Sequence, residues 1–492
     1  MLFEPIFTHA RQHPQDIAVI DDRGQYTWQQ LAAMVAGLGM YVSFQTQAPR
    51  VGLLLPAGAG FVASFYGTLL AGKTVAPINF LLSEKEIAHI IKDSGIDTVL
   101  TAGPLAGKIK DTSLKIIDLL TLPPAPPADL SDIDLPTPGA DEIAVVLYTS
   151  GTAGLPKGVL LSYGNLQSDV DAAIKHAQLQ GKHSFLGILP LFHSTGMLAT
   201  LIAPIQLGSK VVYQGTGFRP NHVIKAIKEH QLSIVAAVPS MYGAMIRLKD
   251  AGPDDLKSLY AAISGGEPLP AVIRDGFEKK FNQPIYEGYG LTETIGPIAF
   301  NVPGRRQPGS VGQLIPGAEA RLVDDDGNVA PQGQSGEIWL RGPMIMKGYH
   351  NLPAETAAAM SADGFFKTGD LGMLDADGYL HITGRKKDQI NIAGEKASPR
   401  EIEETLNQHP AVAESAVVAK KDTSRGEVAA AFIILREGQS VKPDELRDFC
   451  RRQGLAQWKI PRDIQFVPDL PRSPTGKVVK RNLVEQFSNA SA

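Results

Sequence analysis

Between residues 50 and 101, short apolar runs of strand length alternate with longer stretches of helical periodicity. The strand-like runs lie at 50–55, 74–77 and 98–100, and the helical stretches at 61–70 and 84–94. Strands that alternate with helices form βαβ units, which build parallel sheets covered by helices. This alternation predicts an α/β fold around a parallel sheet.

The segments before and after this alternation indicate more than one domain. A helix capped by Thr27 precedes the alternation, and a proline-rich and acidic loop at 121–142 leads into another strand at 143–148. Short strands and turns at 312–349 predict a small antiparallel β unit. Two helices at 401–406 and 443–453 and two strands at 413–419 and 428–435 predict a small α+β domain. A chain of 492 residues is too long for one core, so we place a domain boundary near 385–388.

The charge balance excludes one class of partner. The chain has 47 Lys and Arg against 51 Asp and Glu, a formal net charge of −4, and no basic tail. A nucleic acid is held mainly through its phosphates by clustered cations, so we expect no nucleic-acid partner. The sequence leaves the oligomeric state open.

Cysteine usage and hydropathy indicate the compartment. Cys450 is the single cysteine, so the chain cannot form an internal disulfide or a CxxC metal site, and we expect a reducing, cytoplasmic location. Residues 1–7 lack the basic and apolar regions of a secretory signal. Residues 51–72 and 184–209 carry no Asp, Glu, Lys or Arg, but their prolines and glycines favour buried core over a transmembrane segment.

A loop rich in glycine, hydroxyl groups and lysine follows the strand at 143–148. Its backbone N–H groups, hydroxyls and lysine charge are suited to wrapping a polyphosphate. The candidate phosphate ligands are Thr149, Ser150, Gly151, Thr152, Gly154 and Lys157. Gly158 stands where a P-loop would need a Mg²⁺-binding hydroxyl, so a P-loop ATPase is disfavoured. A turn that merely contains small residues is the alternative.

Five blocks in order along the chain carry a family resemblance. They are Tyr148 to Val159, Ser264-Gly-Gly-Glu267, Tyr289-Gly-Leu-Thr-Glu-Thr294, Phe366-Lys-Thr-Gly-Asp370 with Gly384-Arg385, and Pro471 to Lys477. Together they resemble the adenylate-forming superfamily, and within it the acyl-CoA synthetases that act on fatty or aromatic acids. The resemblance implies a large N-terminal adenylation domain over 1–385 and a small mobile C-terminal domain over 386–492.

The central blocks carry the expected nucleotide site. Tyr289 offers a flat face for adenine, and Gly265 and Gly266 leave room for a planar ring. Thr292 is placed to hydrogen-bond the α-phosphate, and Glu293 is a hard oxygen ligand for Mg²⁺; a helix-capping role is the alternative for Glu293. The same site includes Glu267, Gly288 and Gly290.

The resemblance assigns further roles in the last third of the chain. Asp370 would accept hydrogen bonds from the ribose hydroxyls, and Arg385 would hold the ribose or phosphate side. Lys477 resembles the lysine that enters the site for adenylate formation, Lys387 the hinge, and Gly394 the glycine beside the pantetheine tunnel. A turn aspartate, surface cations and a turn glycine are the alternatives.

A basic stretch surrounds the candidate lysine. Nine basic side chains between 447 and 481 face three acidic ones within the same stretch, and we expect part of it to receive phosphates of ATP or coenzyme A. A solvated surface is the alternative. The basic residues are Arg447, Arg451, Arg452, Lys459, Arg462, Arg472, Lys477, Lys480 and Arg481.

The acid pocket is less well defined by sequence. His193, within 189–197, stands where amino-acid-activating relatives carry an aspartate for the α-amine, so an α-amino acid is disfavoured. The resemblance makes His193 a candidate catalytic residue that lines the acid carboxylate or gates the thiol tunnel, and a packed, hydrogen-bonded histidine is the alternative. The segments 239–245 and 294–300 add apolar lining without a fixed charge, which favours a fatty or aromatic acid. Ala153 replaces a threonine common in the family, so we expect weaker contacts to ATP.

The resemblance implies that this chain is an AMP-forming acid:CoA ligase. A carboxylic acid would be activated by ATP and Mg²⁺ to an acyl adenylate, and coenzyme A would then take the acyl group. Two alternatives remain, an acyl-AMP ligase that loads the phosphopantetheine of a carrier protein and a non-catalytic ligand-binding relative.

Overall fold

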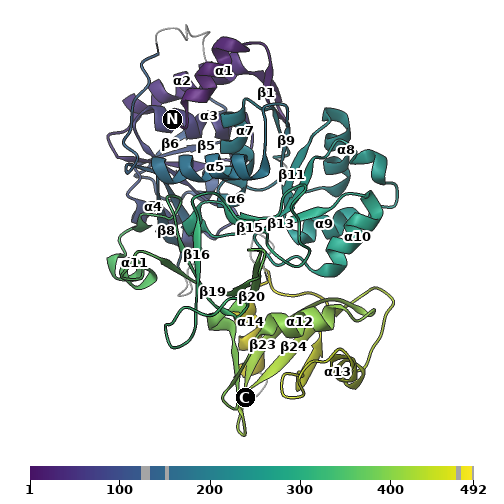
Figure 1. Ribbon diagram of the computed structural model, residues 1–492. Helices are drawn as coiled ribbons and strands as arrows, with labels where there is room; N and C mark the ends of the chain where they lie inside the picture. Colours follow the sequence, from purple (N-terminus) through teal and green to yellow (C-terminus); the bar gives the residue numbers. More distant parts are fainter. Residues whose placement is uncertain (124–132, 150–154, 216, 473–477, 490–492) are drawn as a thin grey trace. The chain divides into compact units, whose positions relative to one another are not determined.

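The chain divides into two compact units in the computed structural model, which describes residues 1–123, 133–149, 155–215, 217–472 and 478–489, and the side chains through 484 (Figure 1). The large unit comprises Met1–Pro268, Gly276–Glu319 and Leu340–Phe366. The small unit comprises Leu269–Asp275, Ala320–Trp339 and Lys367–Ala492.

A seven-stranded sheet in the large unit contains the predicted alternation. Its order is β18-β8-β7-β4-β3-β5-β6. The strands are β3 (Arg50–Leu54), β4 (Thr74–Pro77), β5 (Thr98–Thr101), β6 (Lys115–Asp118), β7 (Ile143–Thr149), β8 (Lys157–Ser162) and β18 (Gly348–Tyr349). Strands β7, β4, β3, β5 and β6 are parallel, which confirms the prediction, whereas β8 and β18 add to the edge in antiparallel orientation.

The helices next to this sheet begin at caps that the sequence encodes. Helix α2 (Trp28–Gln45) starts at a capping box formed by Thr27 and Gln30, and α4 (Glu84–Ser94) at one formed by Ser83 and Glu86. Helix α3 (Ala59–Leu70) is buried along almost its whole length, as its lack of charged residues predicts.

A nine-stranded mixed sheet forms the rest of the large unit's framework. Its order is β15-β14-β13-β12-β11-β9-β10-β1-β2. The strands are β1 (Ile17–Asp21), β2 (Gly24–Thr27), β9 (Phe185–Gly187), β10 (Val211–Tyr213), β11 (Ile234–Ala237), β12 (Ala261–Ser264), β13 (Ile285–Gly290), β14 (Pro297–Phe300) and β15 (Gln313–Leu314). The central strands run parallel, while β2, β14 and β15 are antiparallel to their neighbours.

Further helices accompany the two sheets. They are α1 (Glu4–Gln12), α5 (Tyr163–Ala177), α6 (Ser194–Met197), α7 (Ala203–Leu207), α8 (Pro220–His230), α9 (Pro239–Ile246), α10 (Ala271–Phe281) and α11 (Pro353–Ala359), with a π-helical turn at Leu198–Ile202. The charge-free stretch 51–72 lies mainly in β3 and α3, and the stretch 184–209 lies mainly in β9, α6, the π-helical turn and α7. Residues such as Val51, Val62 and Leu201 are fully buried, as expected for core. Within the described ranges, no helix combines the length and apolar character needed to cross a membrane.

Four strands between residues 319 and 385 form a separate sheet of order β16-β17-β19-β20. Its strands are β16 (Glu319–Val323), β17 (Gly336–Arg341), β19 (Phe366–Leu374) and β20 (Leu380–Arg385). The small β unit expected at 312–349 is confirmed only for β16 and β17, because β15 and β18 at its two ends pair with the sheets of the large unit, whereas the antiparallel β19 and β20 complete the four-stranded sheet.

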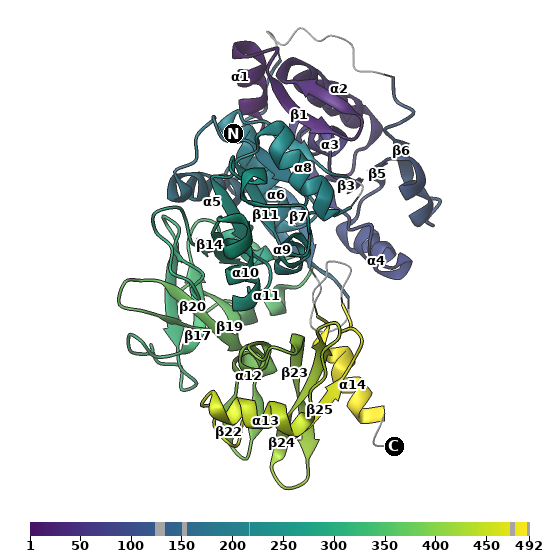
Figure 2. The same ribbon diagram turned by 90° about the vertical axis from the view of Figure 1, so that its right-hand side faces the viewer.

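The C-terminal part of the small unit is an α+β fold, as predicted. Strands β21 (Ile390–Ile392), β22 (Glu395–Ala397), β23 (Val412–Asp422), β24 (Gly426–Leu435) and β25 (Asp463–Phe466) form one sheet, and α12 (Pro399–Asn407), α13 (Pro443–Arg452) and α14 (Lys480–Asn489) surround it (Figure 2). Val417 packs with Ile402 of α12 and Leu446 of α13, whereas its neighbour Val418 packs with Leu483 of α14. Successive residues of a strand face opposite sides, so both faces of the sheet are covered.

The structure confirms the fold class, with parallel sheets in the large unit and a smaller α+β part at the C-terminus.

Candidate active site

The candidate phosphate loop connects two antiparallel strands. Thr149 ends β7 and lies opposite Lys157, the first residue of β8. A Cβ at Gly158 would lie 2.9 Å from Val146 Cγ1 and 3.1 Å from Tyr148 Cζ, so packing closes the position where a P-loop carries its hydroxyl. Ser150, Gly151, Thr152, Ala153 and Gly154 lie outside the described residues.

The strand that leads into this loop is anchored to α4 by a polar group that sequence reasoning missed. Tyr148 Oη donates to Asp93 Oδ2 at 2.7 Å, and Asn351 Nδ2 donates to Asp93 Oδ1 at 3.3 Å. Burial, followed by the hydrogen bond with Asp93, raises the pKa of Tyr148, so its hydroxyl stays a donor at neutral pH. These bonds hold the end of β7, and with it Thr149, in a fixed position.

Tyr349 connects the phosphate loop to the predicted metal ligand. Its hydroxyl donates to Glu293 Oε1 at 2.8 Å, and Lys157 Nζ lies 5.4 Å from the centroid of its ring. The backbone carbonyl of Glu293 also accepts from the N–H of Met346 at 2.8 Å. The structure thus brings Lys157 and Glu293, far apart in sequence, to a shared tyrosine.

Burial sets the ionisation of this tyrosine. It raises the pKa of Tyr349, and the Glu293 charge raises it further, so the phenol remains protonated and keeps donating to the carboxylate. Glu293 lies in a 3-10 turn, Thr292–Thr294, directly after β13. The turn places Thr292 beside Glu293, at the end of a strand.

The candidate purine-binding residues lie at the carboxyl ends of two neighbouring parallel strands, β12 and β13. β12 and β13 pair Ser264 with Glu287, so Gly265, Gly266 and Glu267 emerge beside Gly288, Tyr289 and Gly290. A Cβ at Gly265 would lie 3.6 Å from the carbonyl oxygen of Gly288, and Gly266 has a φ of +82°, a conformation that favours glycine. Ligands of open α/β sheets bind at the carboxyl ends of strands, where these residues lie.

Asp370 and Arg385 lie opposite each other in the small unit. They are register partners in β19 and β20, and Arg385 Nε lies 2.8 Å from Asp370 Oδ1. Asp370 is buried and Arg385 is half exposed. The predicted ribose-binding pair is therefore adjacent in this structure.

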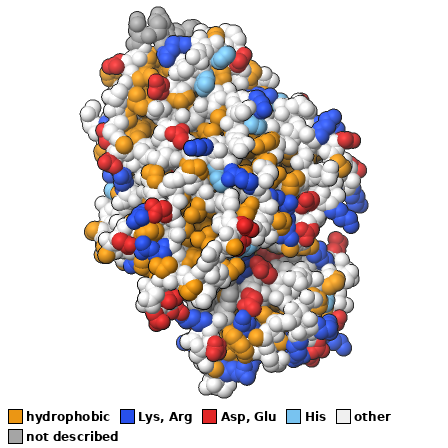
Figure 3. Space-filling view, viewed as in Figure 1, with side chains coloured by type: hydrophobic (Ala, Val, Ile, Leu, Met, Phe, Trp, Pro, Cys, Tyr) orange, Lys and Arg blue, Asp and Glu red, His pale blue; other side chains and the backbone are white. Residues whose placement is uncertain are grey.

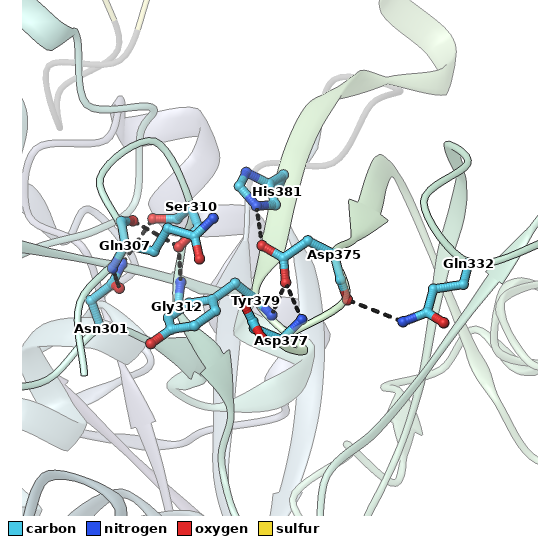
Figure 4. A network of polar contacts seen from close by, with 9 residues as sticks. All are labelled: Asn301, Gln307, Ser310, Gly312, Gln332, Asp375, Asp377, Tyr379 and His381. Carbon is cyan, nitrogen blue, oxygen red and sulfur yellow. Dashed lines mark hydrogen bonds and ion pairs between the residues drawn. The ribbon is translucent and has the colours of Figure 1, made fainter.

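The hairpin that sets this register is held by one carboxylate. Asp375 Oδ1 accepts from the N–H groups of Asp377 and Tyr379 at 3.0 and 2.9 Å, and its Oδ2 lies 3.0 Å from His381 Nε2 (Figure 4). In the large unit, Asn301 similarly fixes the loop after β14 by donating to the carbonyl of Ser310 at 2.8 Å (Figure 4). Both contacts fix loops that follow site-bearing strands.

Three further predicted site residues, Lys387, Gly394 and Lys477, belong to the small unit. Lys387 is exposed in the 3-10 turn Lys386–Asp388, next to the ion pair of Lys386 with Glu337 at 2.9 Å. Gly394, with a φ of +94°, lies in the turn between β21 and β22, where no atom would touch a Cβ within 4 Å. The backbone conformation, and not lack of space, requires glycine there. Lys477 lies outside the described residues.

Most of the basic stretch at 447–481 is paired with acids. Six of its nine cations lie in ion pairs. Five of the six acidic partners lie outside 447–481, so a count of charges within the stretch does not include them. The pairs are Arg447–Asp444, Arg451–Asp448, Lys459–Glu401, Arg462–Asp422, Arg472–Glu414 and Lys480–Glu403. On the face seen in Figure 3 the two signs of charge are interspersed. The expectation of a phosphate-receiving patch loses its main support, since neighbouring carboxylates neutralise these cations.

The predicted acid-pocket segments have mixed roles. His193 is half-buried at the start of α6, with its ring 5.0 Å from that of Phe192. Tyr242 in 239–245 is fully buried and donates to the carbonyl of Ile263 at 2.8 Å, which is a core role. The segment 294–300 borders a buried carboxyl, Asp169, which the sequence analysis did not single out.

Family comparisons cover most of the chain. Residues 6–350 match the AMP-binding enzyme family, and residues 401–477 match the AMP-binding enzyme C-terminal domain. The long-chain-fatty-acid–CoA ligase of Bacillus subtilis is 33% identical over 89% of this chain and 85% of its own. The feruloyl-CoA synthase of an Amycolatopsis species is 30% identical over 97% of both chains.

Solved structures agree with these relatives. ATP-bound MatB from Rhodopseudomonas palustris superposes with a TM-score of 0.89 at 27% identity, over the whole of both chains. The o-succinylbenzoate coenzyme A synthetase of Bacillus subtilis, in complex with ATP and magnesium ion, gives a TM-score of 0.87 at 29% identity over 98% of this chain and 99% of its own. By sequence, by fold and by its motifs, this chain belongs to the AMP-binding enzyme family, the adenylate-forming superfamily.

Proposed function

We propose that this chain is an AMP-forming acid:CoA ligase that activates a fatty or aromatic carboxylic acid. The observation that carries the proposal is the Lys157–Tyr349–Glu293 arrangement, which joins a phosphate-loop cation to a metal-ligand carboxylate. Such a pairing suits the triphosphate of ATP, which needs both direct cationic contacts and a divalent ion. The relatives' names, which include fatty-acid and feruloyl ligases, support the same reaction class.

The reaction has two steps. The acid carboxylate attacks the α-phosphorus of ATP, the bond to the β-phosphate bridging oxygen breaks, and pyrophosphate leaves with the acyl adenylate still bound. The sulfur of coenzyme A then attacks the acyl carbon as the thiolate, and AMP leaves with the electron pair of the broken C–O bond. No protein nucleophile is required, so the protein contributes positioning and charge stabilisation.

Glu293 fits a magnesium ligand. Its carboxylate is oriented by Tyr349, and the described residues contain no group of three acidic, His or Cys side chains that could hold a metal by themselves. Mg²⁺ usually takes one or two carboxylates together with substrate phosphates, which this donor set matches. When bound, Mg²⁺ would offset the charge of the phosphates.

The other residues have proposed roles in nucleotide binding. Thr149 and Lys157 contact the β- and γ-phosphates, and Thr292 donates to the α-phosphate. Gly265, Gly266 and Glu267 with Gly288, Tyr289 and Gly290 hold the purine, and Asp370 with Arg385 holds the ribose. The roles of Ser150, Gly151, Thr152 and Gly154 remain predictions of the sequence.

The small domain has proposed roles in both steps. We place it at 386–492, with Lys387 as its hinge, and the large domain at 1–385. Lys477 neutralises the carboxylate and the α-phosphate during the first step, and Gly394 lines the path of pantetheine in the second. The lone Cys450 is buried, with its pKa raised by burial to about 11, which fits a reduced, cytoplasmic chain.

One assay tests the function. The purified chain is incubated with ATP, Mg²⁺, a panel of fatty and aromatic acids, and either coenzyme A or a phosphopantetheinylated carrier protein. We expect release of AMP and pyrophosphate that depends on the acid and on coenzyme A. Turnover only with the carrier protein would support an acyl-AMP ligase, and no pyrophosphate with any acid would refute both.

A further inference from the structure

Helix α5 presents a stripe of buried polar side chains. Asn165, Asp169 and His176 are spaced four and seven residues apart, so they share one face of the helix, and all three are buried. Asn165 Nδ2 donates to the carbonyls of Pro343 and Ile345 at 2.7 and 2.8 Å, and His176 Nε2 lies 3.0 Å from the carbonyl oxygen of Phe300. Contacts on either side of Asp169 therefore fix this face of α5 against the loops that it covers.

Asp169 differs from these two neighbours. Its side chain is fully buried, and neither carboxylate oxygen has a hydrogen-bond partner among the described residues. A buried carboxyl without a partner is costly in either protonation state, since the ion loses its hydration and the acid leaves its O–H unpaired. Burial raises the pKa of Asp169 well above its ordinary range. Proteins rarely keep such a group unless it serves something beyond packing.

The position of the Asp169 carboxyl indicates which function this buried group serves. A Cβ built on Gly296 would lie 2.6 Å from Asp169 Oδ2 and 2.3 Å from Leu198 Cδ2. Gly296 belongs to the segment 294–300, and Leu198 directly follows 189–197. The sequence predicts both segments, 189–197 and 294–300, to line the acid pocket. The carboxyl therefore reaches the place where both segments meet, and Gly296 leaves the space that admits it.

We propose that Asp169 is a specificity-determining residue that pairs with a hydrogen-bond donor, a hydroxyl or amino group, on the body of the acid substrate. This inference rests on the proposed function. A hydroxyl can pair with the neutral or the ionised carboxyl, and an ammonium group pairs with the ionised form. The segments around the pocket are otherwise largely apolar, so the acid is an aliphatic or aromatic carboxylate that bears a polar substituent.

A buried group of this kind discriminates strongly. A site built to hydrogen-bond a substrate group rejects the analogue that lacks it, because the protein's own polar group is then left unpaired. Replacing Asp169 with leucine removes that penalty and keeps the number and branching of the side-chain heavy atoms. The variant should therefore lose its preference for the substituted acid and improve with the unsubstituted one.

The experiment compares matched acids of one carbon skeleton. The probes are 3-phenylpropanoate against its 4-hydroxyphenyl and 4-aminophenyl analogues, and decanoate against 10-hydroxydecanoate and 10-aminodecanoate. The readout is kcat/KM for pyrophosphate release by the full-length chain. We expect the wild type to prefer a substituted acid in at least one series by about tenfold or more. Asp169→Leu should bring that ratio to about one, with Asp169→Asn between the two.

The design separates failure of the inference from failure of the proposed function. A ratio of two acids on one preparation does not depend on the fraction of folded protein. Asp171→Asn, an exposed change on the same helix, is the matched control and should keep the wild-type ratio. No wild-type preference in either series, or an unchanged ratio in Asp169→Leu, overturns the inference alone. Absence of pyrophosphate with every acid overturns the proposed function itself.

Discussion

At the scale of single residues, the site depends on a tyrosine that belongs to none of the five motifs. Tyr349 is held in β18, which pairs with β8 next to the phosphate loop, and it orients Glu293 through one hydrogen bond of 2.8 Å. A hydrogen bond to a charged group contributes about 1.5–3 kcal/mol. A phenol that remains protonated is therefore a structural partner of the carboxylate and not a competitor for the metal.

Removing this hydroxyl should weaken the use of magnesium. Tyr349→Phe leaves Glu293 without its orienting donor, and we expect kcat/KM for adenylate formation to fall by about tenfold, with a higher Mg²⁺ concentration needed for half-maximal rate. The measurement is ATP–pyrophosphate exchange over a magnesium titration. Tyr41→Phe on α2 serves as the control. An unchanged magnesium dependence would contradict the assigned role of Tyr349.

At the scale of elements, charged side chains join helices to the sheet of the small unit. Lys480 is at the start of α14, and its Nζ lies 2.7 Å from Glu403 Oε1 of α12. The same Oε1 accepts a hydrogen bond from the N–H of Val417 of β23 at 2.6 Å. Burial raises the pKa of Glu403, and the charge of Lys480 opposes that rise. The pair thus connects α14, which follows the segment with Lys477, to the core of its unit.

Breaking this pair should destabilise the protein in a pH-dependent manner. Lys480→Met leaves Glu403 buried without its cation, and we expect the free energy of unfolding to fall by about 2 kcal/mol at pH 8. A carboxyl whose pKa is raised in the folded state destabilises the folded protein as the pH rises. The stability lost in Lys480→Met should therefore shrink towards pH 4–5, where Glu403 binds a proton. Denaturant unfolding at several pH values measures this.

A double-mutant cycle provides the control for this pair. The double variant, Lys480→Met with Glu403→Met, contains no unpaired buried charge. Its free energy of unfolding at pH 8 should therefore fall less than that of Lys480→Met alone. A loss that is the same at every pH would show that packing of the lysine chain, and not its charge, explains the effect.

At the scale of the whole molecule, the two half-reactions are assigned to different residues of the C-terminal region. Lys477 is proposed to serve only the first step, and the turn at Lys386–Asp388 to allow the change between the steps. Each assignment predicts a loss confined to one half-reaction, which a general loss of folding cannot imitate.

The first of these losses concerns the lysine. Lys477→Ala should lower adenylate formation by about a hundredfold or more, because no cation then offsets the charge of the reacting groups, while thioester formation from supplied acyl adenylate stays near the wild-type rate. Pyrophosphate release and acyl-CoA formation are measured separately. Equal loss in both assays would refute the role.

The second loss concerns the hinge. Lys387→Pro fixes the φ angle and removes an N–H, so it should slow thioester formation by about tenfold or more and leave adenylate formation nearly unchanged. Lys386→Met, which removes the neighbouring ion pair to Glu337 without restricting the backbone, is the control. A normal rate of thioester formation in Lys387→Pro would contradict a hinge at this residue.

Features encoded within a dozen or so residues were predictable. The helix at 84–94 is found with the predicted ends because its serine cap, its acidic first turn and its apolar spacing are all local. The parallel order of the first sheet follows from the strand–helix alternation, and the motif order pointed to the family. The bounds of the β unit were wrong, since β15 and β18 pair with the sheets of the large unit, and β19 and β20 join it only through pairing between distant segments.

The amino-acid sequence by itself indicated many of the local elements, the reaction class and the candidate nucleotide ligands, because residue types and short spacings carry that information. The tertiary structure decided which groups meet. It paired Tyr349 with Glu293, matched four cations of the basic stretch with carboxylates from other elements, and buried Asp169 beside Gly296 without a partner among the described residues. Burial and charge compensation depend on packing between distant segments, and no local pattern encodes that packing.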